Sequence, residues 1–108
     1  MLYLTGQIGL DPKTGKMISD DVRDQTQQVL RNLQAVLTAA GSSTDQLAHC
    51  FIMLANIQED YETVNQIYSQ WFTSSEFYPA RSSIVAAKLP FEAKVAIECQ
   101  AYTTQEIE

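Results

Sequence analysis

Basic residues are scarce in this chain of 108 residues. Lys and Arg together number 7 against 13 Asp and Glu, which gives a formal net charge of −6. The basic residues form no run, and an acidic surface repels the phosphate backbone of nucleic acids. The composition therefore argues against nucleic acid as a partner.

Proline, glycine and long apolar runs are also few. With 3 Pro, 4 Gly and 45% hydrophobic residues, the composition is that of a globular domain and not of a disordered chain. No segment reaches the apolar length of a membrane span, and the first residues resemble neither a signal peptide nor a transit peptide. We expect one soluble domain over residues 1–108, in the cytoplasm, with a mitochondrial location left open.

Cysteine and histidine are rare in this chain. The two cysteines, Cys50 and Cys99, lie in apolar segments without CxxC spacing, and His49 is the one histidine. We expect two reduced, buried thiols, and neither a disulfide nor a zinc site. The acidic pairs at 20–21 and 59–60 fit helix-start charges and not metal ligands. We interpret His49 as a partly exposed residue at a strand edge and give it no catalytic role.

Two segments have the period of amphipathic helices. The first follows capping residues at 19–21 and ends at Gly41, a residue suited to a left-handed C-cap. The second follows a loop at 56–60, and its aromatic stripe predicts core or interface packing. The apolar positions are Val22, Thr26, Val29, Leu30, Leu33, Val36, Leu37 and Ala40 in the first, and Tyr61, Val64, Ile67, Tyr68, Trp71 and Phe72 in the second.

The remaining apolar segments predict strands. We expect strands at 2–10, 16–18, 48–55, 78–88 and 94–102, with turns at 11–15 and 89–92. The resulting order β, β, α, β, α, β, β predicts an α+β fold in which both helices cover one face of a mixed sheet.

The last predicted strand has two different faces. Val95, Ile97, Cys99 and Ala101 alternate with Ala96, Glu98, Gln100 and Tyr102. The second set is apolar enough to pack against another copy of the chain, yet it carries the carboxylate of Glu98, which is costly to bury without a partner or a purpose. Alternatively, Glu98 is simply an exposed strand residue.

Arg81 follows a fixed bend. Pro79 restricts its own backbone and that of Tyr78, so Arg81 should leave a defined turn at the start of a strand. A guanidinium held in this way can bind a carboxylate through two parallel hydrogen bonds. The alternative is a structural ion pair or a solvated side chain.

Six segments together resemble the reactive intermediate deaminase family, also called YjgF/YER057c/UK114. They cover nearly the whole chain and occur in the order and spacing of the family; Pro-Ala-Arg-Ser followed by a terminal strand with a glutamate is the most diagnostic pair. The segments are Thr5-Gly6-Gln7-Ile8, Asp11-Pro12-Lys13-Thr14-Gly15, residues 25–41, Thr63-Val64-Asn65-Gln66-Ile67-Tyr68, Pro79-Ala80-Arg81-Ser82 and residues 95–101.

The resemblance implies a chorismate-mutase-like fold and a homotrimer with a central barrel and ligand clefts between subunits. It also implies hydrolysis of enamines and imines, such as 2-aminoacrylate and 2-aminocrotonate, to 2-keto acids and ammonia without cofactor or metal. On this basis Arg81 would bind the substrate carboxylate and Glu98 would position or activate the attacking water. Gly6, Asn65 and Ser83 would line the cleft.

The sequence departs from the family pattern at two places. The family usually carries a strand and loop, with a cleft tyrosine, before the position of Met1, and residues 1–108 do not include this segment. Ser83 stands where active members often have cysteine, so a hydroxyl replaces a thiol.

Two other functions remain open. The first is a non-catalytic protein that binds small carboxylates or keto acids and regulates a partner. The second, a ribonuclease or translation inhibitor, is attached to some members of the family and is disfavoured by the acidic charge balance.

Overall fold

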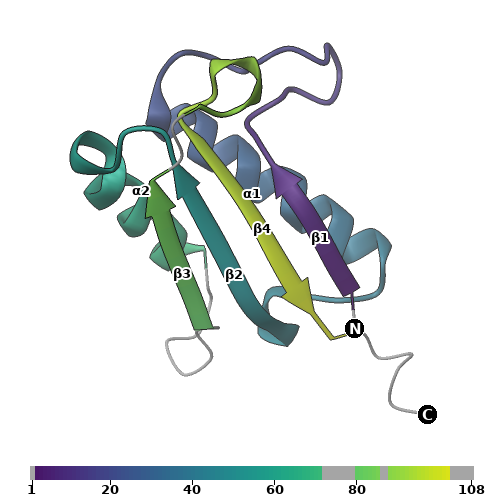
Figure 1. Cartoon of the computed structure of the whole chain (residues 1–108). Coiled ribbons are helices and arrows are strands. Elements are labelled where there is room, and N and C mark those ends of the chain that lie inside the picture. Colours follow the sequence, from purple (N-terminus) through teal and green to yellow (C-terminus); the bar gives the residue numbers. More distant parts are fainter. Residues whose placement is uncertain (1, 72–79, 86–87, 103–108) are drawn as a thin grey trace.

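In the part of the chain that the structure describes, four strands form one sheet with two helices on one of its faces (Figure 1). The computed structural model describes residues 2–71, 80–85 and 88–102, and at positions 5, 45 and 80–85 it describes the backbone alone. The predictions for Phe72, Tyr78 and Pro79 lie outside these residues. None of the described helices is long and apolar enough to cross a membrane.

The sheet is mixed, as the sequence predicted. The strands β1 (Leu2–Gln7), β2 (Leu47–Leu54), β3 (Ala80–Val85) and β4 (Val95–Ala101) are arranged in the order β1-β4-β2-β3. β4 pairs antiparallel with β1 and β2, whereas β2 and β3 run parallel. The predicted α+β class with a mixed sheet is therefore confirmed.

The helices α1 (Val22–Ala39) and α2 (Ile57–Gln70) pack against each other and against the sheet. Asp21 caps α1 by accepting a hydrogen bond from the Arg23 N–H at 2.7 Å. At the other end Gly41 has φ of +75°, and the N–H groups of Gly41 and Ser42 donate to the carbonyls of Thr38 and Leu37. This is the Schellman arrangement that glycine favours, so both predicted ends of α1 are confirmed.

Three details of the predicted elements are wrong. The segment 16–18 is not a strand, because Leu10 and Met17 form only an isolated bridge. The helix α2 begins at Ile57, inside the predicted loop, with Asn56 at its N-cap position. Tyr61 belongs to the predicted apolar stripe of this helix but is exposed, whereas Val64, Ile67 and Tyr68 are buried.

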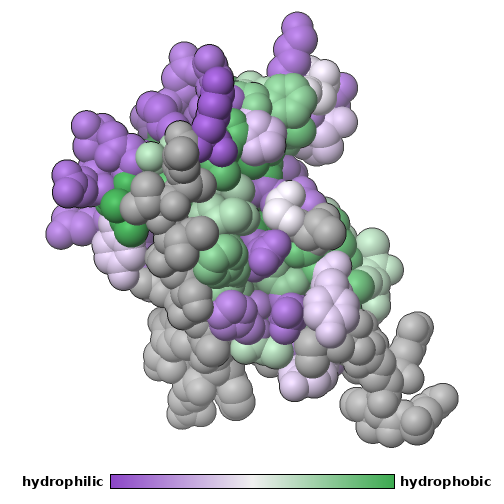
Figure 2. Space-filling view, in the orientation of Figure 1, coloured by the Kyte–Doolittle hydropathy of each residue, from purple (hydrophilic) through white to green (hydrophobic). Residues whose placement is uncertain are grey.

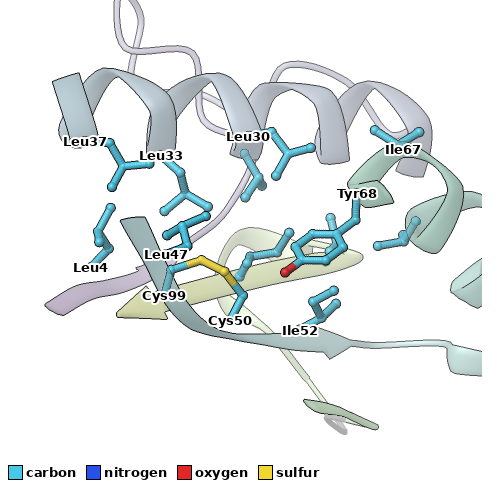
Figure 3. Close-up of a cluster of buried hydrophobic side chains, with 14 of the residues drawn as sticks. Leu4, Leu30, Leu33, Leu37, Leu47, Cys50, Ile52, Ile67, Tyr68 and Cys99 are labelled. Carbon is cyan, nitrogen blue, oxygen red and sulfur yellow. A yellow bond between two sulfur atoms is a disulfide. The ribbon is translucent and has the colours of Figure 1, made fainter. Parts of the chain in front are cut away.

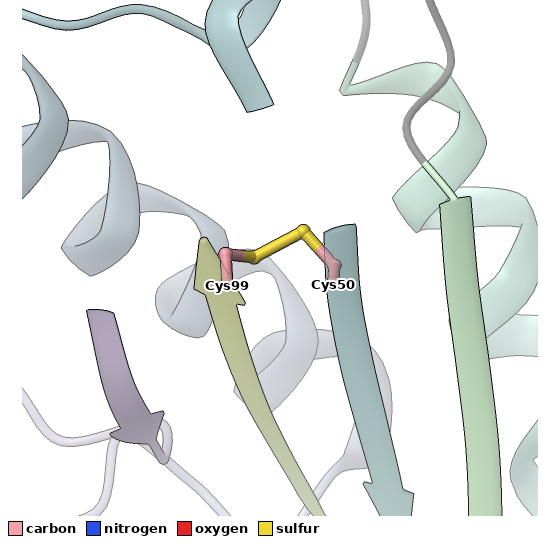
Figure 4. The surroundings of a disulfide bond; sticks show 2 residues. All are labelled: Cys50 and Cys99. Atoms are coloured by element: carbon pink, nitrogen blue, oxygen red, sulfur yellow. A yellow bond between two sulfur atoms is a disulfide. The ribbon is translucent and has the colours of Figure 1, made fainter. Parts of the chain in front are cut away.

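The two cysteines are joined by a disulfide, which corrects the expectation of free thiols (Figures 3 and 4). Cys50 of β2 and Cys99 of β4 stand directly opposite each other, with their Cα atoms 4.1 Å apart. Antiparallel strands bring directly opposed side chains close at every second pair. The sequence shows two buried cysteines, but their pairing depends on a register that only the folded sheet supplies.

The main core lies between the sheet and the helices (Figure 3). It contains the disulfide together with leucines of α1 and the inward positions of β2 and β4. A smaller cluster on the other face covers one end of the sheet and consists of Leu89, Ala93 and Ala96, with Ile8, Met17, Met53 and Ala55 packed against it.

Candidate functional site

The face of the sheet that carries no helix holds the polar groups of interest. β1, β4 and β2 are neighbours, and their register pairs Tyr3 with Gln100, His49 with Gln100, and Phe51 with Glu98. Directly opposed residues project to the same side of a sheet. Figure 2, in the orientation of Figure 1, shows hydrophilic and hydrophobic residues side by side on this face.

A shallow hollow of about 120 Å³ lies at this position. A water molecule needs only about 10–15 Å³ of such free space, so the hollow can admit a small molecule. Its lining residues are Tyr3, Leu4, His49, Phe51, Glu98, Cys99 and Gln100.

Glu98 is the carboxylate of this hollow. It is exposed on β4, as the alternation of the strand predicted, while its neighbours Ile97 and Cys99 are buried in the core. Because Ala96 is covered by the smaller cluster, Glu98 and Gln100 are the open polar positions of this strand.

The backbone of Arg81 lies two strands away from that of Glu98. The register pairs Cys50 with Arg81 and Phe51 with Ser82, so Ser82 and not Arg81 shares the register position of Glu98. Strands are about 4.8 Å apart, which puts β3 about 10 Å from β4. Cys50, the register partner of Arg81, belongs to the core between the sheet and the helices, so the backbone register of one chain does not place Arg81 beside Glu98.

The three predicted cleft residues lie at different places. Gly6 is exposed on β1, beside a register irregularity, and a Cβ at this position would come within 3.7 Å of Met53 Cε. Ser83 is paired with Ile52 in β3. Asn65 is partly buried on α2, in the helical layer, so the fold of one chain does not bring it to the hollow.

His49 lines the hollow, a position that the sequence interpretation did not give it. β2 lies between β4 and β3, so His49 is not at a sheet edge, although it is partly exposed as expected. It lines the hollow together with Glu98. The sequence does contain a sign of this position: His49 is two residues before Phe51, and residues two apart in a strand share a face.

A second group of polar residues lies at the other end of β4. Buried Gln25 of α1 donates to the Ser19 carbonyl at 2.9 Å and accepts from the Lys94 N–H at 2.8 Å. Burial raises the pKa of Asp60 in α2, Lys94 opposes this shift, and Glu59 and Asp21 add to it. Within the described part of the chain, no group of three or more metal-ligand side chains gathers.

Comparison with known proteins defines the family. The sequence profile of the family described as endoribonuclease L-PSP matches residues 1–103. The chain belongs to this family. Its relationship to the reactive intermediate deaminases, expected from the six sequence segments, is confirmed by the individual relatives.

Two relatives show how similar this chain is to named deaminases. It is 44% identical over 99 residues to "Reactive Intermediate Deaminase A, chloroplastic" of Arabidopsis thaliana. The aligned region covers 92% of this chain and 51% of the Arabidopsis protein. The chain thus spans about half the length of that relative. It is 38% identical over 100 residues to the human 2-iminobutanoate/2-iminopropanoate deaminase, covering 93% of this chain and 71% of the human protein.

The fold of this family member also matches solved structures. The structure described as E. coli TdcF with bound serine superimposes with a TM-score of 0.84 at 33% identity, covering 94% of this chain and 80% of that one. The described elements therefore have the arrangement of the family.

Proposed function

We propose that this protein hydrolyses small enamine and imine carboxylates, such as 2-aminoacrylate and 2-aminocrotonate, to 2-keto acids and ammonia. The observation that carries the proposal is the carboxylate of Glu98 in an open hollow, in a chain related to proteins named deaminases of imino acids. The reaction needs orientation, a water molecule and proton transfer at an electrophilic carbon.

In this reaction the enamine first becomes its imine tautomer, water adds to the carbon of the C=N bond, and the resulting carbinolamine loses ammonia to leave a ketone. Arg81 binds the substrate carboxylate through its guanidinium. Glu98 accepts a proton from the attacking water as the new C–O bond forms. Gly6, Ser83 and Asn65 line the cleft.

We further propose that the working form is a homotrimer in which the helix-free faces of the sheets form a central barrel. Asn65 is on the helical layer of its own chain, so its contribution to the cleft requires residues from two subunits. The substrate is then enclosed between neighbouring copies.

The test of this function generates 2-aminoacrylate in situ and measures the fraction trapped as a semicarbazone. Wild-type protein should lower the trapped fraction below that of the reaction without it. In Arg81→Ala, the loss of a charge-assisted contact should cost about 2–4 kcal/mol of transition-state stabilisation. This corresponds to a fall in kcat/KM of about 30- to 1000-fold.

Arg23→Ala is the matched control, because Arg23 is an exposed arginine of α1. It should keep the wild-type rate. If wild-type protein leaves the semicarbazone yield unchanged, the proposed activity is wrong.

Non-catalytic binding of small carboxylates is the second candidate, favoured by the serine bound in the structurally similar E. coli protein. Calorimetric titration with pyruvate and with serine separates the two functions. Binding that is lost in Arg81→Ala, together with no hydrolysis by wild type, would support a binding protein.

Ribonuclease activity is a third candidate, because the matching family is described as an endoribonuclease family. The net charge of −6 opposes it, and among the side chains that the structure describes, the lining of the hollow contains neither lysine nor arginine. Incubation of purified protein with labelled RNA at low and high salt tests this activity directly.

A further inference from the structure

His49 and Glu98 occupy one hollow on adjacent strands. His49 stands opposite Gln100 and Phe51 stands opposite Glu98, so the histidine and the glutamate are diagonal neighbours. Diagonal neighbours across antiparallel strands are about 7–8 Å apart. Two side chains at this spacing can contact a small molecule from two directions.

The proposed reaction requires more proton transfer than the activation of water. Addition of water to an imine removes a proton from oxygen and adds one to nitrogen. Loss of ammonia then requires a second proton on nitrogen, while the hydroxyl group gives up its own. One carboxylate can serve only one of these sites at a time.

Among the residues that line the hollow, His49 is the best suited to this work. Imidazole is the side chain that commonly exchanges protons near neutral pH. The titratable groups beside it are Glu98 on β4 and Tyr3 on β1, and its register partner on β3 is Ala80. Gln100, directly opposite His49, is not ionisable.

We propose that His49 is a second proton-transfer residue of this site, a role that rests on the proposed function. In the first step Glu98 takes a proton from water as the C–O bond forms, and protonated His49 gives its proton to the imine nitrogen. In the second step protonated Glu98 gives its proton to the nitrogen. The C–N bond breaks with its electron pair on the departing ammonia, and neutral His49 takes the hydroxyl proton as the C=O bond forms. Both residues return to their starting states.

The test measures kcat and KM for imine hydrolysis as a function of pH, with the spontaneous rate subtracted. Wild-type kcat should depend on pH, since the first step needs a proton on His49 and none on Glu98. His49→Gln should lower kcat by about 100- to 10,000-fold, with a smaller effect on KM, and should change this pH dependence.

A rescue experiment separates proton transfer from packing. In His49→Ala, added imidazole should restore part of the rate, because the shortened side chain leaves room for a free ring. Added imidazole should not restore the rate of Arg81→Ala, because that variant has lost the group that binds the substrate carboxylate and not a proton-transfer group. Thermal melting of each variant checks that it is folded.

Three outcomes would contradict the proposal. Wild-type rate and pH dependence in His49→Gln would exclude a proton-transfer role. A lower rate with an unchanged pH profile and no rescue by imidazole would assign His49 to packing alone. No hydrolysis by wild-type protein would overturn the proposed function itself, and this role with it.

Discussion

Gly9 shows how one residue fixes the loop that leads from β1 to α1. A Cβ on Gly9 would lie 2.9 Å from both the Cα and the carbonyl oxygen of Gln25, atoms of the α1 backbone that cannot move independently. Gln25 in turn holds the Ser19 carbonyl and the Lys94 N–H. The close contact at Gly9 therefore positions the helix, the loop and the start of β4 together.

Gly9→Ala should destabilise the protein by about 1–3 kcal/mol, because the added methyl forces the loop away from α1. Urea unfolding followed by circular dichroism measures the change. Gly6→Ala is the matched control, since its Cβ would meet Met53 Cε at an ordinary 3.7 Å. Equal stability of Gly9→Ala and wild type would contradict the tight contact.

For single residues, the sequence predicted which face of a strand a side chain occupies, but it did not predict hydrogen bonds between distant polar side chains and the backbone. Glu98 was predicted on the open face because strand alternation depends only on neighbouring residues. Gln25 and Asn32 were missed because buried amides in a helix look like surface residues until their distant partners are known. Asn32 donates to the Leu10 carbonyl at 3.0 Å, and the two residues are 22 positions apart in the sequence.

The pairing of β2 with β4 is the element contact with the clearest consequence for stability. The disulfide between Cys50 and Cys99 is on the helix-covered face of these strands, whereas His49, Phe51, Glu98 and Gln100 line the hollow on the other face. One covalent link thus joins the two strands that carry most of the proposed site.

Oxidised protein should be more stable than reduced protein by about 4 kcal/mol, the value that chain entropy gives for a closed loop of this size. The cysteines are separated by 49 positions in the sequence. Urea unfolding with and without a phosphine reductant measures the difference, and Cys99→Ala should not respond to the reductant. Two titratable thiols in unreduced, denatured protein would contradict the disulfide.

The elements themselves were predicted where local chemistry determines them. The first helix was placed correctly because Asp21 and Gly41 are capping residues at its two ends. The start of α2 was missed because Asn56 makes no side-chain capping bond. The predicted strand at 16–18 is reduced to a single bridge between Leu10 and Met17, and its loop is also held by α1, through Gln25 and Asn32.

For the whole molecule, the helix-free face is where assembly should occur. Tyr3 of β1 and Tyr102, which follows β4, are 67% and 52% exposed, and Tyr3 lines the hollow. Large aromatic side chains are enriched in interfaces between subunits. The alternation of β4 suggested such a face, but the sequence of one chain contains no direct information on the number of copies.

Sedimentation should give three times the mass of one chain. Tyr3→Glu should dissociate the trimer, since it adds a carboxylate near Glu98 on a face that becomes buried. Tyr61→Glu is the control, because Tyr61 is an exposed tyrosine on α2. A monomer at all concentrations in wild-type protein would contradict the trimer and the shared cleft.

The position of β4 in the sheet also determines when the protein can fold during synthesis. Among the described strands β4 is the last in the sequence, yet it lies between β1 and β2, and β1 is paired with β4 alone. Residues 2–7 must therefore wait for residues 97–101 before they can pair. Ribosomes add about 5–20 residues per second, and contacts of such long range are slow to form. The nascent chain consequently keeps residues 2–7 unpaired until residues 97–101 have left the ribosome, so this pairing is a late step of folding.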